Sequence, residues 1–199
     1  MSKIWFTSDT HFNQERTLEL SKRPFDSVQV MNDTIIDRWN SVVGKDDTVY
    51  HLGDFGDFTS MDNLNIINSL NGNIILILGN YELNDINNGI ISESTLRVMG
   101  FKEIHNNLII NIPDIGDVFL THEPINCIDI KLDNNIKFNL FGHIHKLQMV
   151  KSFGLNVGTD CHNYTPIDVE TVKFYYNGII NHYDNNVFFD TYNYTDVIN

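Results

Sequence analysis

The feature that most constrains this chain is a set of short apolar runs, each followed directly by polar residues that suit a metal ion. One run, residues 137–140, has the composition of a buried strand and precedes Gly142, His143 and His145. Residues two positions apart in an extended chain face the same side, so both imidazoles can point into one cleft, and Gly142 allows the backbone to turn there. This predicts half of a metal site, although two surface or core histidines satisfy the same pattern.

Four other apolar runs end in the same way. The residues that follow them are Asp9 and His11 after residues 3–7, Asp54 after residues 47–52, Asn80 after residues 74–78, and His122 after residues 118–120. Strands that alternate with helices form a sheet whose carboxyl edge carries the ligand site, so these side chains can converge. The seven oxygen and nitrogen ligands are too many for one tetrahedral ion and suit two ions that share a carboxylate. For Asp9, capping of a helix that begins near Asn13 is the competing interpretation.

Apolar periodicity predicts the remaining elements. We expect helices over residues 27–42, capped by Asp26 or Ser27, over residues 61–70, and, after a polar loop, over residues 93–99. Antiparallel strands are expected over residues 108–112 and 118–120, with a further strand over residues 155–158. Because Asn177-Gly178 is a strong turn signal, residues 171–176 and 179–183 are expected to form a hairpin. The tail 184–199 carries no assignment.

Size and charge narrow the class of protein. The chain has 199 residues, of which 42% are hydrophobic, and this fits one domain over residues 1–199. Since no apolar run approaches about 20 residues, we expect a cytoplasmic protein with no membrane partner. The formal net charge of -13, with no cluster of Lys and Arg, argues against tight binding of duplex DNA. Cys127 and Cys161 lack metal-type spacing and are interpreted as free thiols.

The whole series of motifs resembles one known family. Asp-x-His, Gly-Asp, Gly-Asn, His and Gly-His-x-His follow one another over residues 4–145 in the order found in the calcineurin-like metallophosphoesterases. Arg23-Pro24-Phe25 and the segment 50–55 resemble the small stand-alone members of bacteria and their phages. The resemblance implies an α/β fold, a four-layer α/β/β/α sandwich with the metal site at the carboxyl ends of the strands.

The resemblance also implies a ligand set and a reaction. The first metal ion would be held by Asp9, His11, Asp54 and His145, and the second by Asp54, Asn80, His122 and His143. The implied cofactors are two divalent ions, manganese first, with iron, nickel, zinc and magnesium as alternatives. The implied activity is hydrolysis of phosphodiesters of nucleotides or other small molecules by a hydroxide that bridges the two ions.

One position departs from the family pattern. Most members have Gly-Asn-His followed by Asp or Glu, whereas this chain has Gly79-Asn80-Tyr81-Glu82. The missing histidine usually helps to protonate the leaving group, so we expect Tyr81 to be a catalytic donor alongside Asn80, or else to pack at the rim of the cleft. Because the unperturbed pKa of tyrosine is about 10, poor leaving groups should react slowly.

Several alternatives remain open at this stage. Arg23 is expected to contact a substrate phosphate, with a surface salt bridge as the alternative. Asp160 and His162 are candidates to orient a ligand histidine, and for His162 a place on a solvated loop is the preferred interpretation. The expected partner is a small phosphoester substrate, and self-association is left open. A phosphomonoesterase or a nuclease of the same fold is the alternative enzyme. A metal-binding scaffold with little turnover is the alternative class, and the replacement of histidine by Tyr81 favours it.

Overall fold

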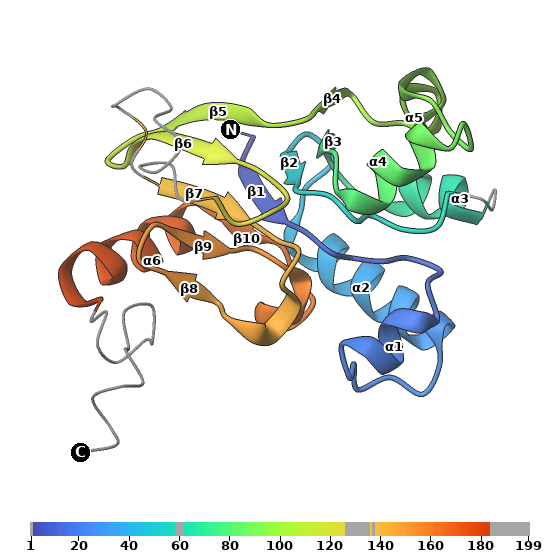
Figure 1. Cartoon of the computed structure of the whole chain (residues 1–199), viewed down its shortest axis with the longest axis horizontal. Helices are drawn as coiled ribbons and strands as arrows, with labels where there is room; N and C mark the ends of the chain where they lie inside the picture. The colour runs from blue at the N-terminus through green and yellow to red at the C-terminus, as the bar shows by residue number, and fades with distance from the viewer. Residues whose placement is uncertain (1, 59–61, 126–135, 137, 184–199) are drawn as a thin grey trace, which may run out of the picture.

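Two five-stranded sheets lie at the centre of the fold in the computed structural model, which describes residues 2–58, 62–125, 136 and 138–183 (Figure 1). The order in the first sheet is β10 (Ile167–Asp168), β1 (Ile4–Thr7), β2 (Thr48–His51), β3 (Asn73–Ile77) and β4 (Glu103–His105). The order in the second is β5 (Leu108–Ile112), β6 (Gly116–Leu120), β7 (Phe138–Phe141), β9 (Gly154–Asn156) and β8 (Val150–Lys151).

Strand direction determines where the chain presents its functional residues. The strands β1 to β4 run parallel to one another, and β10 is antiparallel to β1. In the second sheet β6, β7 and β9 are parallel, whereas β5 and β8 are antiparallel to their neighbours. The carboxyl ends of β1, β2 and β3 therefore share one edge, and those of β6 and β7 share another.

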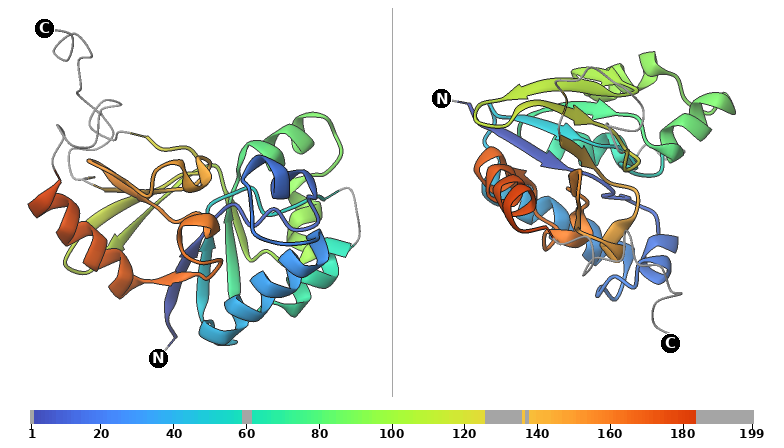
Figure 2. Two further views of the ribbon diagram at one scale, coloured as in Figure 1. Left: turned by 90° about the horizontal axis from the view of Figure 1, so that it is seen from below. Right: turned by 60° about the vertical axis from the view of Figure 1, so that its left-hand side comes forward.

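Helices cover the outer faces of the two sheets and complete the four-layer sandwich (Figure 2). Those on the first sheet are α1 (Arg16–Leu20), α2 (Val28–Val42), α3 (Asp62–Ser69), α4 (Asn80–Asn87) and α5 (Glu93–Met99). Helix α6 (Val169–His182) packs on the second sheet beside β9. Two short 3₁₀ helices, η1 (His145–Leu147) and η2 (Thr159–Cys161), follow strands of the second sheet.

The strands of the first sheet are apolar on both faces, as expected for a sheet covered on both sides. On β1, for example, Trp5 packs in a cluster with Met31 and Trp39 of α2, whereas Phe6 packs in a second cluster with Leu140 of the other sheet. The alternation places one core between the helices and the first sheet and another between the two sheets. Packing in these two cores fixes the position of one sheet edge relative to the other.

Most of the expected elements are present at nearly the predicted bounds. The predicted helix 27–42 is α2, in which the Ser27 side chain accepts a hydrogen bond from the Val30 N–H and thereby caps the first turn. Residues 93–99 form α5, as expected. The polar loop predicted after Glu82 is wrong, because residues 80–87 form α4, with the Glu82 carboxylate accepting the N–H of Gly79 at the N-cap.

The hairpin predicted around Asn177-Gly178 is also wrong, because the whole segment is helix α6. Asp168 caps the helix by accepting the Thr171 N–H at 2.9 Å. Val172 and Ile179, two helical turns apart, are both buried in the core of the second sheet. This packing outweighs the local turn preference of the Asn-Gly pair.

Gly178 offers a test of that conclusion. It lies in the helix interior, and an added Cβ would meet no atom within 4 Å. Gly178→Ala should therefore raise the free energy of unfolding by roughly 0.5–1 kcal/mol, because alanine loses less backbone entropy on folding. Gly89→Ala is the matched control, since it is equally open but has φ +69°, and should destabilise instead. Urea denaturation of both variants measures whether each substitution raises or lowers the free energy of unfolding. A loss of stability in Gly178→Ala would contradict the helix.

Several expectations lie outside the described residues, including those on Cys127, the start of the helix predicted at residue 61, and the tail 184–199. Cys161 is a free thiol, as expected. Within the described part of the chain, no helix is both long and apolar enough to cross a membrane. That residues 1–199 form a single domain stays a prediction.

Candidate metal centre

Hydrogen bonds join the carboxyl edges of the two sheets. After β1, the Asp9 N–H donates to the Gly53 carbonyl at 3.0 Å, and after β7 the Gly142 N–H donates to the His122 carbonyl at 2.8 Å. The His143 N–H then donates across the gap between the sheets to both Asp9 carboxylate oxygens, at 3.0 Å each. The residues that follow five separate strands are therefore held in one place.

Gly142 is required for this approach. A Cβ at Gly142 would lie 2.0 Å from Ser8 Oγ and 2.3 Å from Asp9 Oδ2. Its backbone does not adopt a positive φ, so the turn expected from the sequence is not the reason for glycine here. Instead, the missing side chain lets the second sheet contact the loop that carries Asp9.

The backbone is strained where the candidate ligands lie. Asp9, His11, Asp54, His143 and His145 have φ between 48° and 69°, the left-handed region that residues other than glycine rarely adopt. Such conformations cost about 1–3 kcal/mol each and cluster at functional sites. At His143 and His145 they turn the two side chains into different groups, although residues two apart in an extended strand would face one side, whereas Asp9 and His11 remain in the same group.

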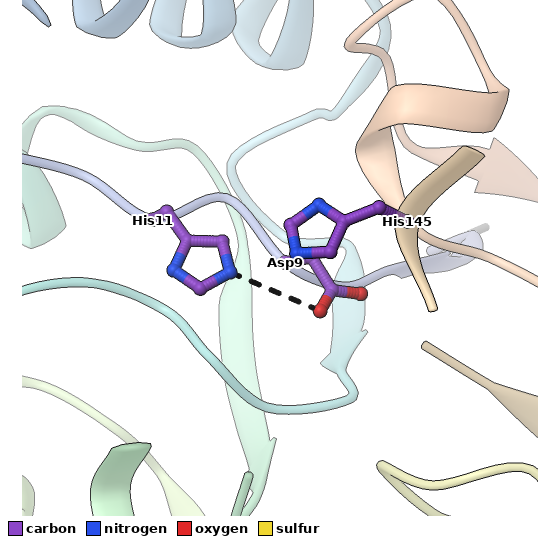
Figure 3. A group of neighbouring side chains, drawn as sticks. All are labelled: Asp9, His11 and His145. Carbon is purple, nitrogen blue, oxygen red and sulfur yellow. Dashed lines mark ion pairs between the residues drawn. The ribbon is translucent and has the colours of Figure 1, made fainter. Parts of the chain in front are cut away.

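The first group consists of Asp9, His11 and His145, whose ligand atoms lie within 4.8 Å of one another (Figure 3). Asp9 and His11 are buried, and the His11 ring stacks on the His145 ring at a centroid distance of 5.1 Å. His11 Nε2 lies 4.0 Å from Asp9 Oδ1 and 3.7 Å from Asp54 Oδ2. The side chains point toward one another from the loop after β1 and from η1.

The second group consists of Asp54, His122 and His143, with Asn80 beside it. Asn80 Oδ1 lies 3.0 Å from both His122 Nε2 and His143 Nδ1, and these two nitrogens are 3.2 Å apart. Asp54 Oδ2 lies 3.3 Å from His122 Nε2. The structure thus brings together all seven residues that the sequence singled out as metal ligands; that they bind metal stays a prediction.

The donor set fits divalent cations. His122 Nδ1 lies 2.7 Å from the Leu52 carbonyl, which can only accept, so Nδ1 carries a proton and Nε2 presents its lone pair to the group in the neutral ring. That lone pair faces the oxygens of Asn80 and Asp54, which are acceptors as well. His11 Nε2 is buried and has no hydrogen-bond partner within the described residues. A cation in each group would satisfy the atoms of that group.

The charges of the site favour a bound cation in the same way. Burial disfavours the charged ring of His122, but the hydrogen bond to Asp54 and the charges of Asp9 and Asp54 raise its pKa to about 9. Burial lowers the pKa of His11 against the attraction of Asp9 and Asp54. Burial works against the charged form of Asp54, yet His122 and His11 hold the pKa of this carboxyl below its usual value. The lowered pKa keeps the Asp54 carboxylate charged and available to a cation.

Glu82 supports the loops of the second group. Its buried carboxylate accepts the N–H groups of Asp54 at 2.9 Å, Phe55 at 2.8 Å and Gly79 at 2.8 Å. Burial and the charge of Asp54 raise its pKa to about 7. The sequence motif gave Glu82 no role of its own, and it did not show that this carboxylate holds the backbone of the loops that carry Asp54 and Asn80.

Tyr81 lies at the edge of the first group. Its ring meets the His11 ring edge to face at a centroid distance of 5.2 Å, and its side chain is half-buried. Its N–H donates to Asp54 Oδ1 at 3.0 Å, which helps to orient that carboxylate. Tyr81 is therefore close enough to the site to act on a substrate, and its role as a proton donor stays a prediction.

The expectation that Arg23 contacts a substrate phosphate is contradicted by its surroundings. Its side chain has 0% exposure, and every nitrogen of the guanidinium already has an acceptor. Asp160 is the ionic partner, at 2.8 Å. The pair is fully buried, so the alternative of a surface salt bridge is wrong as well.

A cavity of about 440 Å³ opens beside the site. His143 and His145 line it on the side of the metal groups, and Leu20, Lys22 and Lys146 line it farther out. Both lysines are exposed, in a chain with a formal net charge of -13. The cavity therefore combines apolar surface with local positive charge next to the candidate ligands.

The family model that describes calcineurin-like phosphoesterases matches residues 2–147. An uncharacterized protein of Methanocaldococcus jannaschii is 40% identical over 84 residues, which cover 41% of this chain and 48% of that protein. The Gene 66 protein of Mycobacterium phage L5 is 38% identical over 85 residues, 41% of each chain. The aligned segments thus span about half the length of these curated relatives or less.

A solved structure shares the fold. The crystal structure of a protein of unknown function from Aquifex aeolicus has a TM-score of 0.69 to this chain, with 23% sequence identity. The match covers 88% of this chain and 100% of that one. At this level of identity the likeness concerns the fold alone.

Proposed function

The chain belongs to the calcineurin-like phosphoesterase family, and on that premise we propose that it is a phosphodiesterase that uses two divalent metal ions. The observation that carries the proposal is the position of Asp54. Its Oδ2 lies 3.7 Å from His11 Nε2 in the first group and 3.3 Å from His122 Nε2 in the second. One carboxylate thus faces both groups, as a bridge between two ions requires.

Each group of residues has a distinct task in this proposal. Asp9, His11 and His145 hold one ion, Asn80, His122 and His143 hold the other, and Asp54 holds both. Two such ions, when bound, neutralise the phosphoryl oxygens and lower the pKa of a water molecule between them. The Leu52 carbonyl keeps the proton of His122 on Nδ1, and the Tyr81 N–H orients Asp54. In this proposal Tyr81, whose ring lies against that of His11, donates its hydroxyl proton to a leaving oxygen.

The cavity beside the site supports a small substrate. Its volume of about 440 Å³ suits an organic ester rather than a polymer. Lys22 and Lys146 attract an anionic ester, and Leu20 contacts an apolar group attached to it. We keep manganese as the proposed metal and the cytoplasm as the proposed location. Hydrolysis of monoesters, cleavage of nucleic acid and metal binding without turnover are the alternatives.

The test is metal-dependent turnover. Metal-free protein, resupplied with manganese, nickel, magnesium or zinc, is assayed with bis(p-nitrophenyl) phosphate and with p-nitrophenyl phosphate. We expect diester hydrolysis that needs metal and exceeds monoester hydrolysis. Faster monoester turnover would identify a phosphatase, and two bound ions without turnover of either ester would favour the scaffold.

Tyr81→His places at position 81 the histidine that most family members have there, and so tests the role of this residue. An imidazole has a pKa nearer to neutrality than a phenol, so the variant should hydrolyse a dialkyl phosphate, whose leaving group is an alkoxide, about 10-fold faster at pH 7. Loss of p-nitrophenolate, which needs little protonation, should change less than about threefold. Tyr81→Phe, which keeps the ring against His11, is the matched control. Equal effects on both leaving groups would show that Tyr81 only packs at the rim.

A further inference from the structure

The buried pair of Arg23 and Asp160 is the strongest feature of the site that the proposed function does not use. We propose that this pair positions the first metal group, Asp9, His11 and His145, and leaves the second group to a separate support. The inference rests on the proposed function, because it treats both groups as metal sites. It assigns Arg23 and Asp160 as positioning residues.

Asp160 acts on His145 directly. Its side chain, on η2, is 1% exposed, and its Oδ2 lies 2.7 Å from His145 Nδ1. A carboxylate can only accept, so His145 Nδ1 carries the proton and Nε2 is left as the ligand nitrogen. Ser21 Oγ lies 3.0 Å from the same Nδ1. The ring is thereby held in one tautomer, turned toward Asp9 and His11 (Figure 3).

Arg23 connects Asp160 to the other two ligands. Nε and Nη2 donate to the two Asp160 oxygens at 3.0 Å and 2.8 Å, a bidentate arrangement that a lysine cannot reproduce. Nη1 donates to the Thr10 carbonyl at 2.9 Å, and Nη2 also donates to the Asp9 carbonyl. One guanidinium therefore ties the backbone of the loop that carries Asp9 and His11 to the carboxylate that holds His145.

The second group has a different support. Glu82 accepts the Asp54 N–H, and the Leu52 carbonyl accepts from His122 Nδ1. Within the described residues, the recorded hydrogen bonds of Arg23 and Asp160 reach neither of these ligands. The pair is linked to the second group indirectly, through the Asp9 carboxylate that accepts the His143 N–H. Loss of the Arg23 and Asp160 pair should therefore weaken the first ion far more than the second.

The experiment measures metal binding rather than turnover. Full-length, metal-free protein is titrated with Mn²⁺ by calorimetry, and bound metal is counted by mass spectrometry after desalting. We expect two ions in the unsubstituted protein. In Asp160→Asn and in Arg23→Lys, one Kd should rise about 10- to 100-fold while the other changes less than about threefold. Asp114→Asn and Arg97→Lys, which change an exposed carboxylate and an exposed guanidinium, are the matched controls.

A second pair of variants identifies the site that is weakened. His145→Ala removes a ligand of the first group, so adding Asp160→Asn to it should change the remaining Kd less than about threefold. His143→Ala removes a ligand of the second group, so adding Asp160→Asn should weaken the remaining ion about 10- to 100-fold. Thermal unfolding of the metal-free variants accompanies each titration, because an unpaired buried charge can destabilise the fold.

The outcomes separate the two proposals. Selective weakening of the first ion supports the role of the pair, whether or not the protein turns over an ester. That role is overturned if binding of both ions weakens equally, in proportion to the loss of thermal stability. It is also overturned if no variant weakens binding of either ion. Fewer than two ions in the unsubstituted protein overturns the proposed function itself.

Discussion

Asp54→Asn is expected to lower metal-dependent hydrolysis of bis(p-nitrophenyl) phosphate on the order of 1,000-fold or more. Asp54 is the residue whose carboxylate faces both groups, and it is 3% exposed. The amide retains an acceptor for the Tyr81 N–H, so the loop can keep its shape. It loses the negative charge that a bridge between two cations supplies, and we therefore expect weaker binding of both ions.

The Asp54→Asn experiment compares turnover and metal content at saturating Mn²⁺. Asp46→Asn removes an exposed carboxylate from the turn between α2 and β2 and should leave both values unchanged. Circular dichroism shows whether the variant keeps its fold. A folded Asp54→Asn protein that retains two ions and more than about a tenth of its turnover would show that Asp54 is not the bridge.

Glu82→Ala is expected to lower the free energy of unfolding of the metal-free protein by roughly 3–5 kcal/mol. The substitution leaves three buried N–H groups, those of Asp54, Phe55 and Gly79, without their acceptor. Each unsatisfied buried donor costs about 1–3 kcal/mol. Glu82→Gln should lose about 1–3 kcal/mol, because the amide oxygen replaces one carboxylate oxygen while its NH₂ faces a donor.

The Glu82 variants are compared by urea denaturation. Glu93→Gln is the matched control, because Glu93 lies in the first turn of α5 and is exposed, and it should change stability by less than about 0.5 kcal/mol. If Glu82→Ala were as stable as Glu93→Gln, water rather than Glu82 would have to satisfy the three N–H groups. We also expect Glu82→Gln to bind the second ion more weakly, since its loops carry Asp54 and Asn80.

The two erroneous element predictions share a physical cause. Asn177-Gly178 has the local preference of a turn, and the polar residues after Glu82 have that of a loop. In each case an acidic side chain caps a helix, Asp168 for α6 and Glu82 for α4. Burial against a sheet then stabilises α6 through Val172 and Ile179. Local signals do not include that packing.

The supporting residues show a similar limit. The ligand positions follow strands, so their order along the chain was enough to assemble them. Arg23 and Asp160 are 137 residues apart in the sequence, and no local pattern predicts that they form an ion pair. An arginine near a phosphate site has two ready interpretations, a substrate contact or a surface ion pair, and only burial excluded both.

The sequence by itself determined the alternation of strands and helices and the polar residues at the strand ends, because periodicity and strand order are local properties of the chain. It thereby determined which seven side chains meet at the carboxyl ends of the strands. How they divide into two groups was implied only by the family resemblance, and the tertiary structure supplies the physical reason, because left-handed backbone at His143 and His145 turns these two side chains into different groups. Only the tertiary structure decided what supports each group, since hydrogen bonds between distant residues depend on how the two sheets pack.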